Sequence, residues 1–375
     1  MQLYGQAGIT ASSYQVPAAG GATLIWTVNG GGSGYNLGAT NLASNSTQVV
    51  AGASGGGGIK AYVFDITDGS VEFQPSTVYS DGGSGSASYA KTGDMSEDWS
   101  ALAGPAQDNV FLVDNSDGSL ERTFSSPISA SGNFGENNAI GVSDLYTAIG
   151  NPSALRMYIY NNSTGALIAT ITSPSGGATD VRTTDTHTLH SSGLDGPVTI
   201  YDPSNGNSRY TISNPQYDAS SSFDYFGRYL DICDDYILLS AHLEDNPSES
   251  ATNVGVAYLF NTSDGSLAQT FVNPINFDTE FGMTLAVSDT YTAIGSYSED
   301  PAGGSNNNYG VVRVYNNSDG SLYAKIDSPV SAGGQFGSKI AMANTATTSY
   351  ITIGARYQGV GSQTSNGAIY TYTLG

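Results

Sequence analysis

The sequence has a single cysteine, Cys233, so no intrachain disulfide can form. Cys233 lies in the apolar run YLDIC, where we expect a buried, inert thiol rather than a nucleophile. Histidine is also scarce, and only His187, His190 and His242 occur. His187 and His190 are three residues apart, which on a strand places their rings on opposite faces. We therefore predict no joint metal site for them and no catalytic role.

Positive charge is the next shortage. Lysine and arginine total 11 against 33 aspartate and glutamate residues, which gives a net charge of −22. Such a surface repels nucleic acid and anionic lipid, so we expect neither as a partner. No apolar run is long enough for a membrane span, and the start, MQLYGQAGIT, has no basic and apolar signal pattern. We expect no membrane insertion and no secretory signal at this end.

Motifs of known enzyme classes are missing as well. The chain has no G-x-S-x-G elbow, no P-loop and no H-E-x-x-H. The glycine-rich stretch at 52–60 lacks the Lys-Ser/Thr of a phosphate cradle, and we expect a loop there. The sequence therefore predicts no catalytic residues, no metal and no cofactor.

What the chain does have is glycine and tyrosine, 48 and 25 residues respectively, which is typical of a loop-rich all-β protein. Its most conspicuous stretch is VRVYNNSDGSLYAKI (312–326), two apolar runs around an Asp-Gly turn, which predicts a β-hairpin. Five further copies occur at 61–75, 110–124, 157–171, 198–212 and 257–271.

The turn glycines of these copies are 41 to 59 residues apart, too far for hairpins alone. A second pair of strands fits between them, as in EFGMTLAVSDTYTAIGSYSED (280–300). Each unit therefore has four short strands, which we call A to D, and a repeat of this length predicts a propeller blade. Strand D carries charges and should form the outer edge. The A–B pair recurs at 133–153, 225–245 and 335–356, and more weakly at 35–54, 86–106 and 178–193.

Seven such units are present, and the last lacks strand D. Residues 22–28 (ATLIWTV) match the missing strand, so we expect them to pair with the C-terminal blade and close the ring. The predicted fold is an all-β, seven-bladed β-propeller of four-stranded antiparallel blades over residues 20–375, with residues 1–19 as a free N-terminal arm. The expected blades are 35–78, 79–128, 129–174, 175–215, 216–274, 275–329 and 330–375 plus 22–28.

A phenylalanine-glycine pair opens several units, and the same units end in a strand containing glycine or alanine. On these features the chain resembles the FG-GAP β-propeller repeat family, which includes integrin α-subunit heads, over residues 22–374. The resemblance implies a propeller that binds proteins or glycans, with calcium in D-x-D-G-x-x-D loops in some members. The short A–B turns here lack that motif, so no calcium site is carried over. The pairs are Phe134-Gly135, Phe226-Gly227, Phe281-Gly282 and Phe336-Gly337; the turns are Ser143-Asp144, Asp234-Asp235 and Ser288-Asp289.

The longest loops occur in the fifth and sixth units and open on one face of the disk. Aromatic residues beside carboxylates suit a protein or carbohydrate surface, whereas a simpler interpretation is that long acidic loops only vary in length. Paired carboxylates could also serve a glycosidase. The candidate ligand-binding residues are Tyr217, Asp218, Phe223, Asp224, Tyr225, Glu244, Asp245, Tyr297, Glu299, Asp300 and Tyr309.

Taken together, the sequence favours a non-enzymatic structural or binding module. A phage virion component is the first expectation, as a decoration, neck, tail or receptor-binding protein. A secreted cell-surface or matrix adhesin is the alternative, and a polysaccharide-cleaving enzyme is a further one. The expected location is the virion or the extracellular space. Expected partners are other virion or cell-surface proteins, with glycans and copies of the chain itself left open.

Overall fold

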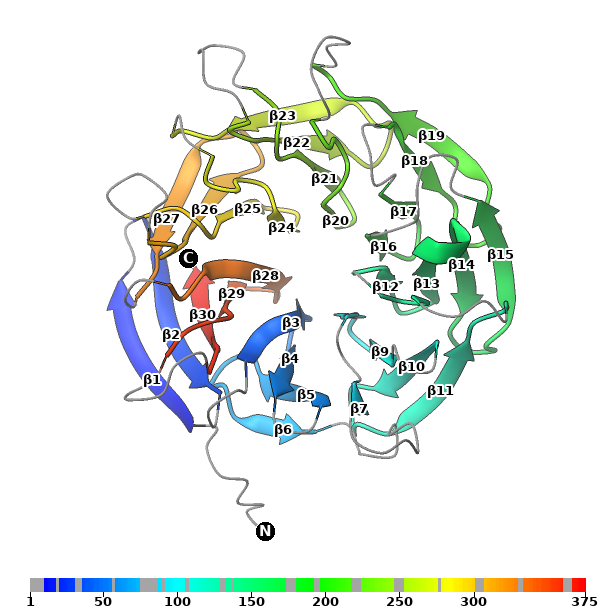
Figure 1. Cartoon of the computed structure of the whole chain (residues 1–375), viewed down its shortest axis with the longest axis horizontal. Coiled ribbons are helices and arrows are strands. Elements are labelled where there is room, and N and C mark those ends of the chain that lie inside the picture. The colour runs from blue at the N-terminus through cyan, green and yellow to red at the C-terminus, as the bar shows by residue number, and fades with distance from the viewer. Residues whose placement is uncertain are drawn as a thin grey trace.

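The computed structural model is a ring of seven β-sheets arranged around a common centre (Figure 1). It describes residues 10–17, 20–30, 36–55, 58–74, 87–88, 92–104, 108–128, 133–136, 138–172, 180–191, 196–216, 224–245, 253–275, 278–300, 307–329, 333–359 and 366–375. The predicted all-β, seven-bladed propeller is confirmed. Within these ranges the only helix is the short 3₁₀ turn Pro152–Ala154.

Each blade is an antiparallel meander in which strand A lies nearest the centre of the ring and strand D lies at the rim (Figure 1). In order from A to D, blade 1 is β3 (Asn36–Ser44), β4 (Gln48–Gly55), β5 (Gly58–Asp65) and β6 (Val71–Phe73), with β7 (Ala87–Ser88) parallel to β5; blade 2 is β8 (Gly93–Met95), β9 (Trp99–Gly104), β10 (Asn109–Asp114) and β11 (Leu120–Ser125); blade 3 is β12 (Ile140–Val142), β13 (Tyr146–Asn151), β14 (Arg156–Asn161) and β15 (Leu167–Thr172); blade 4 is β16 (Val181–Thr183), β17 (Thr188–His190), β18 (Val198–Tyr201) and β19 (Ser208–Ile212).

The remaining blades follow the same plan. Blade 5 is β20 (Leu230–Ile232), β21 (Tyr236–Ala241), β22 (Val256–Asn261) and β23 (Leu267–Val272); blade 6 is β24 (Thr284–Val287), β25 (Tyr291–Ser296), β26 (Val311–Asn316) and β27 (Leu322–Asp327); blade 7 is β28 (Phe336–Asn344), β29 (Ser349–Ala355) and β30 (Ala368–Leu374), completed by β2 (Ala22–Asn29).

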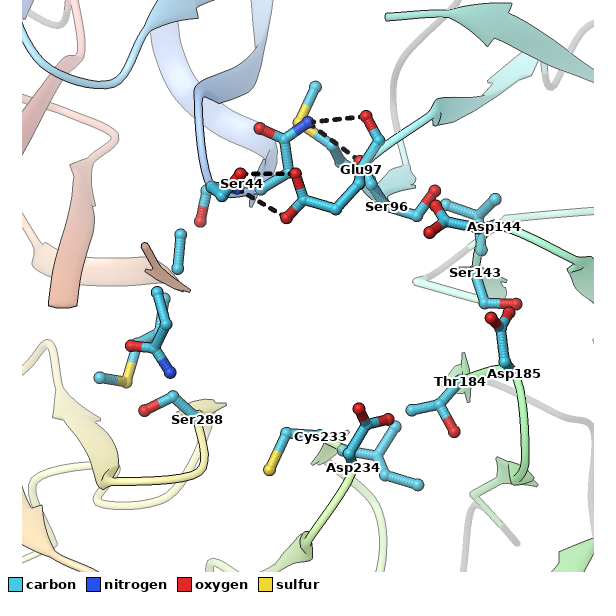
Figure 2. A pocket seen from close by; sticks show the side chains of 18 of the residues that line it. Ser44, Ser96, Glu97, Ser143, Asp144, Thr184, Asp185, Cys233, Asp234 and Ser288 are labelled. Atoms are coloured by element: carbon cyan, nitrogen blue, oxygen red, sulfur yellow. Dashed lines mark hydrogen bonds between the residues drawn. The ribbon is translucent and has the colours of Figure 1, made fainter. Parts of the chain in front are cut away.

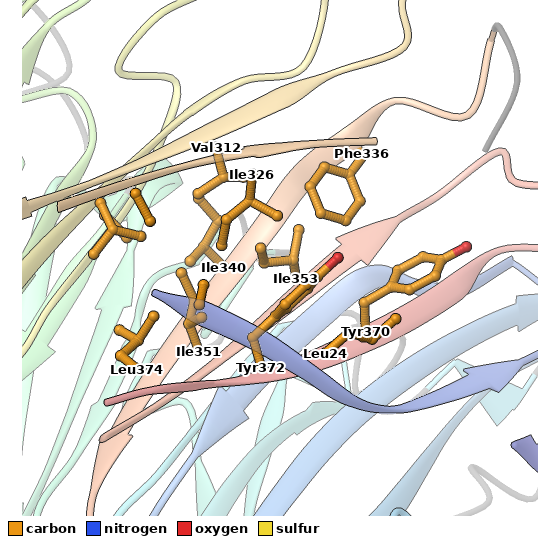
Figure 3. Packing of buried hydrophobic residues seen from close by; sticks show 14 of the residues in the cluster. Leu24, Val312, Ile326, Phe336, Ile340, Ile351, Ile353, Tyr370, Tyr372 and Leu374 are labelled. Atoms are coloured by element: carbon orange, nitrogen blue, oxygen red, sulfur yellow. The ribbon is translucent and has the colours of Figure 1, made fainter. Parts of the chain in front are cut away.

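The ring is closed by the N-terminal strand, as the sequence predicts. Strand β2 pairs with β30 from Ala22 opposite Leu374 to Asn29 opposite Ala368. Leu24 enters the apolar cluster between blades 6 and 7, beside Tyr370 and Tyr372 (Figure 3). One strand from the start of the chain therefore supplies the missing edge of the last sheet.

The expectation of a free N-terminal arm is wrong for the part that the structure describes. Residues Thr10–Pro17 form β1, which pairs antiparallel with β2 on its outer side. The physical reason is that an edge strand presents unpaired backbone groups, and an adjoining extended segment can satisfy them. Residues 1–9 and 18–19 lie outside the described ranges.

The repeated turn glycines join neighbouring blades. Each has φ between +71° and +75°, which glycine adopts readily, and each lies against a strand D residue of the preceding blade. The contacts close the ring, because Gly69 of blade 1 packs on Trp26 of β2. The other pairs are Gly118 with Phe73, Gly165 with Arg122, Gly206 with Ala169, Gly265 with Tyr210 and Gly320 with Gln269.

Several of these strand D side chains also donate to the neighbouring turn. Trp26 Nε1 donates to the Ile66 carbonyl at 2.7 Å, and Arg122 Nε to the Asn162 carbonyl at 2.8 Å. Strand D was expected to carry charge only as an outer edge, but Arg122 links two blades. The sequence repeats the hairpin because each turn must both reverse the chain and fit its neighbour.

Replacing Gly206 by alanine tests this double role. A methyl group there would lie 2.3 Å from Ala169 Cβ, which has no flexible end that could move away. Gly333→Ala is the control, because Gly333 also has positive φ (+86°) but no atom within 4 Å of the added carbon. We expect Gly206→Ala to lower the free energy of unfolding by about 1–3 kcal/mol more than the control does. Equal losses in urea denaturation would contradict the contact.

Candidate functional site

The loop carboxylates predicted as ligand-binding residues are engaged within their own blades. Glu299 is fully buried and pairs with Arg313 of β26, at 2.6 Å from Nη1 and 2.7 Å from Nη2. Glu244 is 3% exposed, accepts from the hydroxyl of Tyr258 in β22, and accepts from Asn214 at 3.2 Å. Equivalent carboxylates thus fasten a loop to strand C in two adjacent blades.

The other predicted residues are distributed over the same face. Asp300 is buried and accepts two bonds from Asn307, while Asp245 is exposed and accepts from the Asn253 amide at 2.8 Å. Asp224 is buried, whereas Tyr225, Tyr297 and Tyr309 are half-buried. Tyr217, Asp218 and Phe223 lie outside the described residues.

A hollow lies on the face of the ring opposite these loops, where the A–B turns of the blades meet around the centre (Figure 2). We call it the wide mouth; its volume is about 570 Å³. Five successive blades, 2 to 6, each place a carboxylate there, and blades 1 and 7 place asparagines. The carboxylates are Glu97, Asp144, Asp185, Asp234 and Asp289, and the asparagines are Asn45 and Asn344.

Some of these carboxylates also connect adjacent turns. Glu97 accepts from Ser46 of blade 1, Asp144 from the Asp98 amide, and Asp185 from the Leu145 amide. Burial, followed by the charges of Asp289 and Asp185, raises the pKa of Asp234. Burial and then Asp144 raise the pKa of Asp98 in the same way. The mouth is therefore a field of like charges, and the described residues contain no group of three ligands spaced to hold a metal ion.

The wide mouth continues into a channel through the centre of the ring. The wall of this channel is first apolar and then, further in, charged. Met95, Val142, Ile232, Val287 and Met342 line a continuation of about 140 Å³, which also reaches Arg182. Arg182 donates to Asp180 at 2.7 Å and to Asp231 at 3.3 Å. Lys339 lies nearby and donates to Asn138 at 3.0 Å.

The channel carboxylates link the innermost strands around the ring. Asp94 accepts from the Val142 amide at 3.0 Å, Asp180 from Leu230 at 3.3 Å, and Asp231 from Val287 at 2.8 Å. In each case the acceptor belongs to one blade and the donor to strand A of the next. Strand A has no further strand beside it, so these side chains satisfy amides that would otherwise lack a partner.

These buried carboxylates predict a specific pH dependence. Burial raises the pKa of Asp180 from 3.8 to about 7, although Arg182 opposes the shift. A raised pKa means that the folded chain holds the proton more tightly, so this contribution is present below pH 4 and is lost as the pH rises to about 7. We expect Asp180→Asn to flatten the change in unfolding free energy between pH 4 and 8, measured in urea. His242, whose pKa burial lowers to about 4, has the opposite effect but is present in both proteins. Parallel pH curves would contradict the assignment.

Sequence reasoning missed both the wide mouth and the channel network. A signal was present, because a carboxylate recurs in the A–B turn of five successive blades. Cys233 lies at this mouth and is half-buried; burial and then Asp289 raise its pKa, as expected for an inert thiol. His190 and His242 are buried, and burial also lowers the pKa of His190.

Comparisons with known proteins identify the fold alone. No family model matches the chain, and no curated protein matches it. Among solved structures, U3-55K is similar with a TM-score of 0.60 and 10% identity, covering 95% of this chain and 99% of that one. The computationally designed Ika8 protein is similar with a TM-score of 0.53 and 14% identity, covering 92% and 97%. No helix in the described part of the chain is long and apolar enough to cross a membrane. The chain is thus a seven-bladed β-propeller by structure.

Proposed function

We propose that the chain is a non-enzymatic structural or binding module. The observation that carries this proposal is the use made of the loop carboxylates. Glu299 has both oxygens on Arg313, and Glu244 bonds Tyr258 and Asn214, so these groups hold their blades together. A glycosidase needs one carboxyl that can give up or accept a proton at the substrate and a second one facing it. A scaffold that commits its loop acids to internal bonds suits binding instead.

The wide mouth is the proposed docking surface for a protein partner. Its carboxylates come from short turns, and burial and then the charges of Asp289 and Asp185 raise the pKa of Asp234. A partner segment that brings lysine or arginine side chains would relieve this repulsion, and its aliphatic stems would fit the apolar channel wall. Such a partner gains affinity from charge without any chemical step.

The proposed setting is a virion, as a phage decoration, neck, tail or receptor-binding protein, with a cell-surface or matrix adhesin as the alternative. An acidic surface, which keeps a protein soluble, and a ring closed by its own N-terminal strand suit a protein exposed outside the cell. Kinship with FG-GAP repeats is part of this proposal. It is supported by four Phe-Gly pairs whose phenylalanines are at most 1% exposed.

Incubation with a panel of neutral and acidic polysaccharides tests the non-enzymatic assignment. We expect no new reducing ends and no unsaturated products. Cleavage that disappears in Glu244→Gln or Glu299→Gln, with the fold retained, would overturn the proposal. Searching purified particles and the secreted fraction of the source organism for the chain by mass spectrometry separates the virion from the adhesin setting.

A further inference from the structure

Two arginines on the face opposite the wide mouth are each held between two tyrosines. Arg228 Cζ lies 4.8 Å from the ring centre of Tyr225 and 5.8 Å from that of Tyr229. Arg356 Cζ lies 5.3 Å from Tyr297 and 4.9 Å from Tyr357. Blade 5 supplies all three residues of the first group, whereas blades 6 and 7 together supply the second. Stacking on aromatic faces fixes a guanidinium plane and leaves its N–H edge available.

The fold brings these pairs to one end of the channel. Arg228 follows Phe226-Gly227 and precedes strand A of blade 5, whereas Arg356 follows strand B of blade 7. Tyr297 follows strand B of blade 6. Burial and then Glu280 raise the pKa of Tyr297, whereas Arg356 lowers it, so both Glu280 and Arg356 lie close to this ring. Strands A and B of a blade are antiparallel. The start of strand A and the end of strand B therefore lie on the same face of the ring. Tyr229 also lines the narrow end of the channel, together with Met283 and Lys339.

Neither arginine forms an ion pair with a carboxylate in the described part of the chain. Arg356 donates Nε to Gln335, and Arg228 bonds the hydroxyl of Tyr229. Most other described basic side chains have a carboxylate partner, as expected in a chain where acids outnumber bases threefold. Those in ion pairs are Arg122, Arg182, Arg209, Arg313 and Lys325.

A buried histidine beside Arg228 gives an independent indication of a ligand. His242 is 6% exposed and packs on Tyr225 and Tyr229, with ring centres 5.3 and 5.2 Å away. Its Nδ1 is buried without a hydrogen-bond partner among the described residues. Burial, then Arg228, lowers its pKa to about 4, so the ring is neutral at pH 7. Buried polar atoms normally have partners, and a ligand would provide one.

We propose that this Tyr–Arg face binds a sugar that carries a carboxylate or sulfate group. The guanidinium edges of Arg228 and Arg356 match an oxyanion with paired N–H donors, and the half-buried and exposed tyrosines offer ring surface to a sugar. A single acidic sugar unit suits the site better than an acidic protein segment, because a net charge of −22 repels extended polyanions. The site lies on the face opposite the wide mouth, so the result of its test does not depend on whether the docking proposal is correct.

Titration of the full chain with glucuronate, followed by tyrosine fluorescence and calorimetry, tests the proposal. Glucose is the neutral control, and glucose 6-sulfate and sodium sulfate separate the sugar from the ion. We expect glucuronate or glucose 6-sulfate to bind with higher affinity than either glucose or sulfate. We also expect this affinity to fall at high salt. Binding of sulfate as tight as either acidic sugar, or no binding by both acidic sugars, overturns the proposal.

Variants locate the binding. Arg228→Gln and Arg356→Gln are each expected to weaken the acidic sugar at least tenfold, whereas Arg209→Gln, on an outer strand, leaves it unchanged. Arg228→Lys keeps the charge but loses the planar stack, so an intermediate loss is expected, and this variant serves if the glutamine change unfolds the chain. Unchanged affinity in Arg228→Gln and Arg356→Gln, or tighter binding of a poly-glutamate peptide than of either sugar, contradicts the site. Asp144→Asn at the wide mouth should leave sugar binding intact.

Discussion

Deleting residues 1–29 is expected to leave a chain that shows no cooperative unfolding transition. The deletion removes β2, and with it the fourth strand of blade 7 and the Trp26 contact with blade 1. Trp26 and Val28 are fully buried, and truncating a buried tryptophan alone typically costs about 3–5 kcal/mol. The whole stability of a domain is only about 5–15 kcal/mol, so loss of the strand should exceed it. Thermal unfolding followed by far-UV circular dichroism measures the outcome.

Deleting residues 1–19 is the matched control. It removes β1, which lies outside the four strands that every blade has, and leaves β2 in place. We expect a small change in melting midpoint, because in the described part of the chain no other blade has a strand outside its strand D. If the two deletions melted alike, the closing strand would not hold the ring together.

Replacing Glu299 by alanine is expected to lower the free energy of unfolding by about 3–5 kcal/mol, the usual cost of leaving one buried charge unpaired. The carboxylate is fully buried and Arg313 is 4% exposed, so water cannot readily replace the lost partner. Urea denaturation monitored by tyrosine fluorescence gives the free energy directly.

Blade 5 supplies the control for this pair. Tyr258 is the third residue of β22, and Arg313 is the third residue of β26. Arg313→Tyr therefore recreates the Glu–Tyr arrangement of Glu244 and Tyr258, and the loss should be smaller, on the order of 1 kcal/mol. A cost for Arg313→Tyr as large as that for Glu299→Ala would show that the two blades do not use equivalent bonds.

Much of the architecture could be predicted because the hairpin repeats. The Asp-Gly turns, the apolar runs and the spacing of the units give the number of blades, and ATLIWTV supplies the absent strand. The N-terminal arm could not be predicted as a strand, because the pairing of β1 depends on where the edge of β2 lies in space. The acidity of Glu244 and Glu299 is visible in the sequence, but their burial is not. That burial depends on Tyr258 and Arg313, fourteen residues further along the chain.

The sequence by itself determined the all-β class, the seven units, the closing strand and the acidic surface, because these follow from local turn chemistry, short-range periodicity and composition. Only the tertiary structure decided which side chains meet. Turns separated by about fifty residues converge on the wide mouth, and Arg228 and Arg356, more than one hundred residues apart, reach the same face. Such meetings depend on the curvature of the ring, which brings the same position of every blade around one axis. No local sequence pattern encodes which of these distant residues come together.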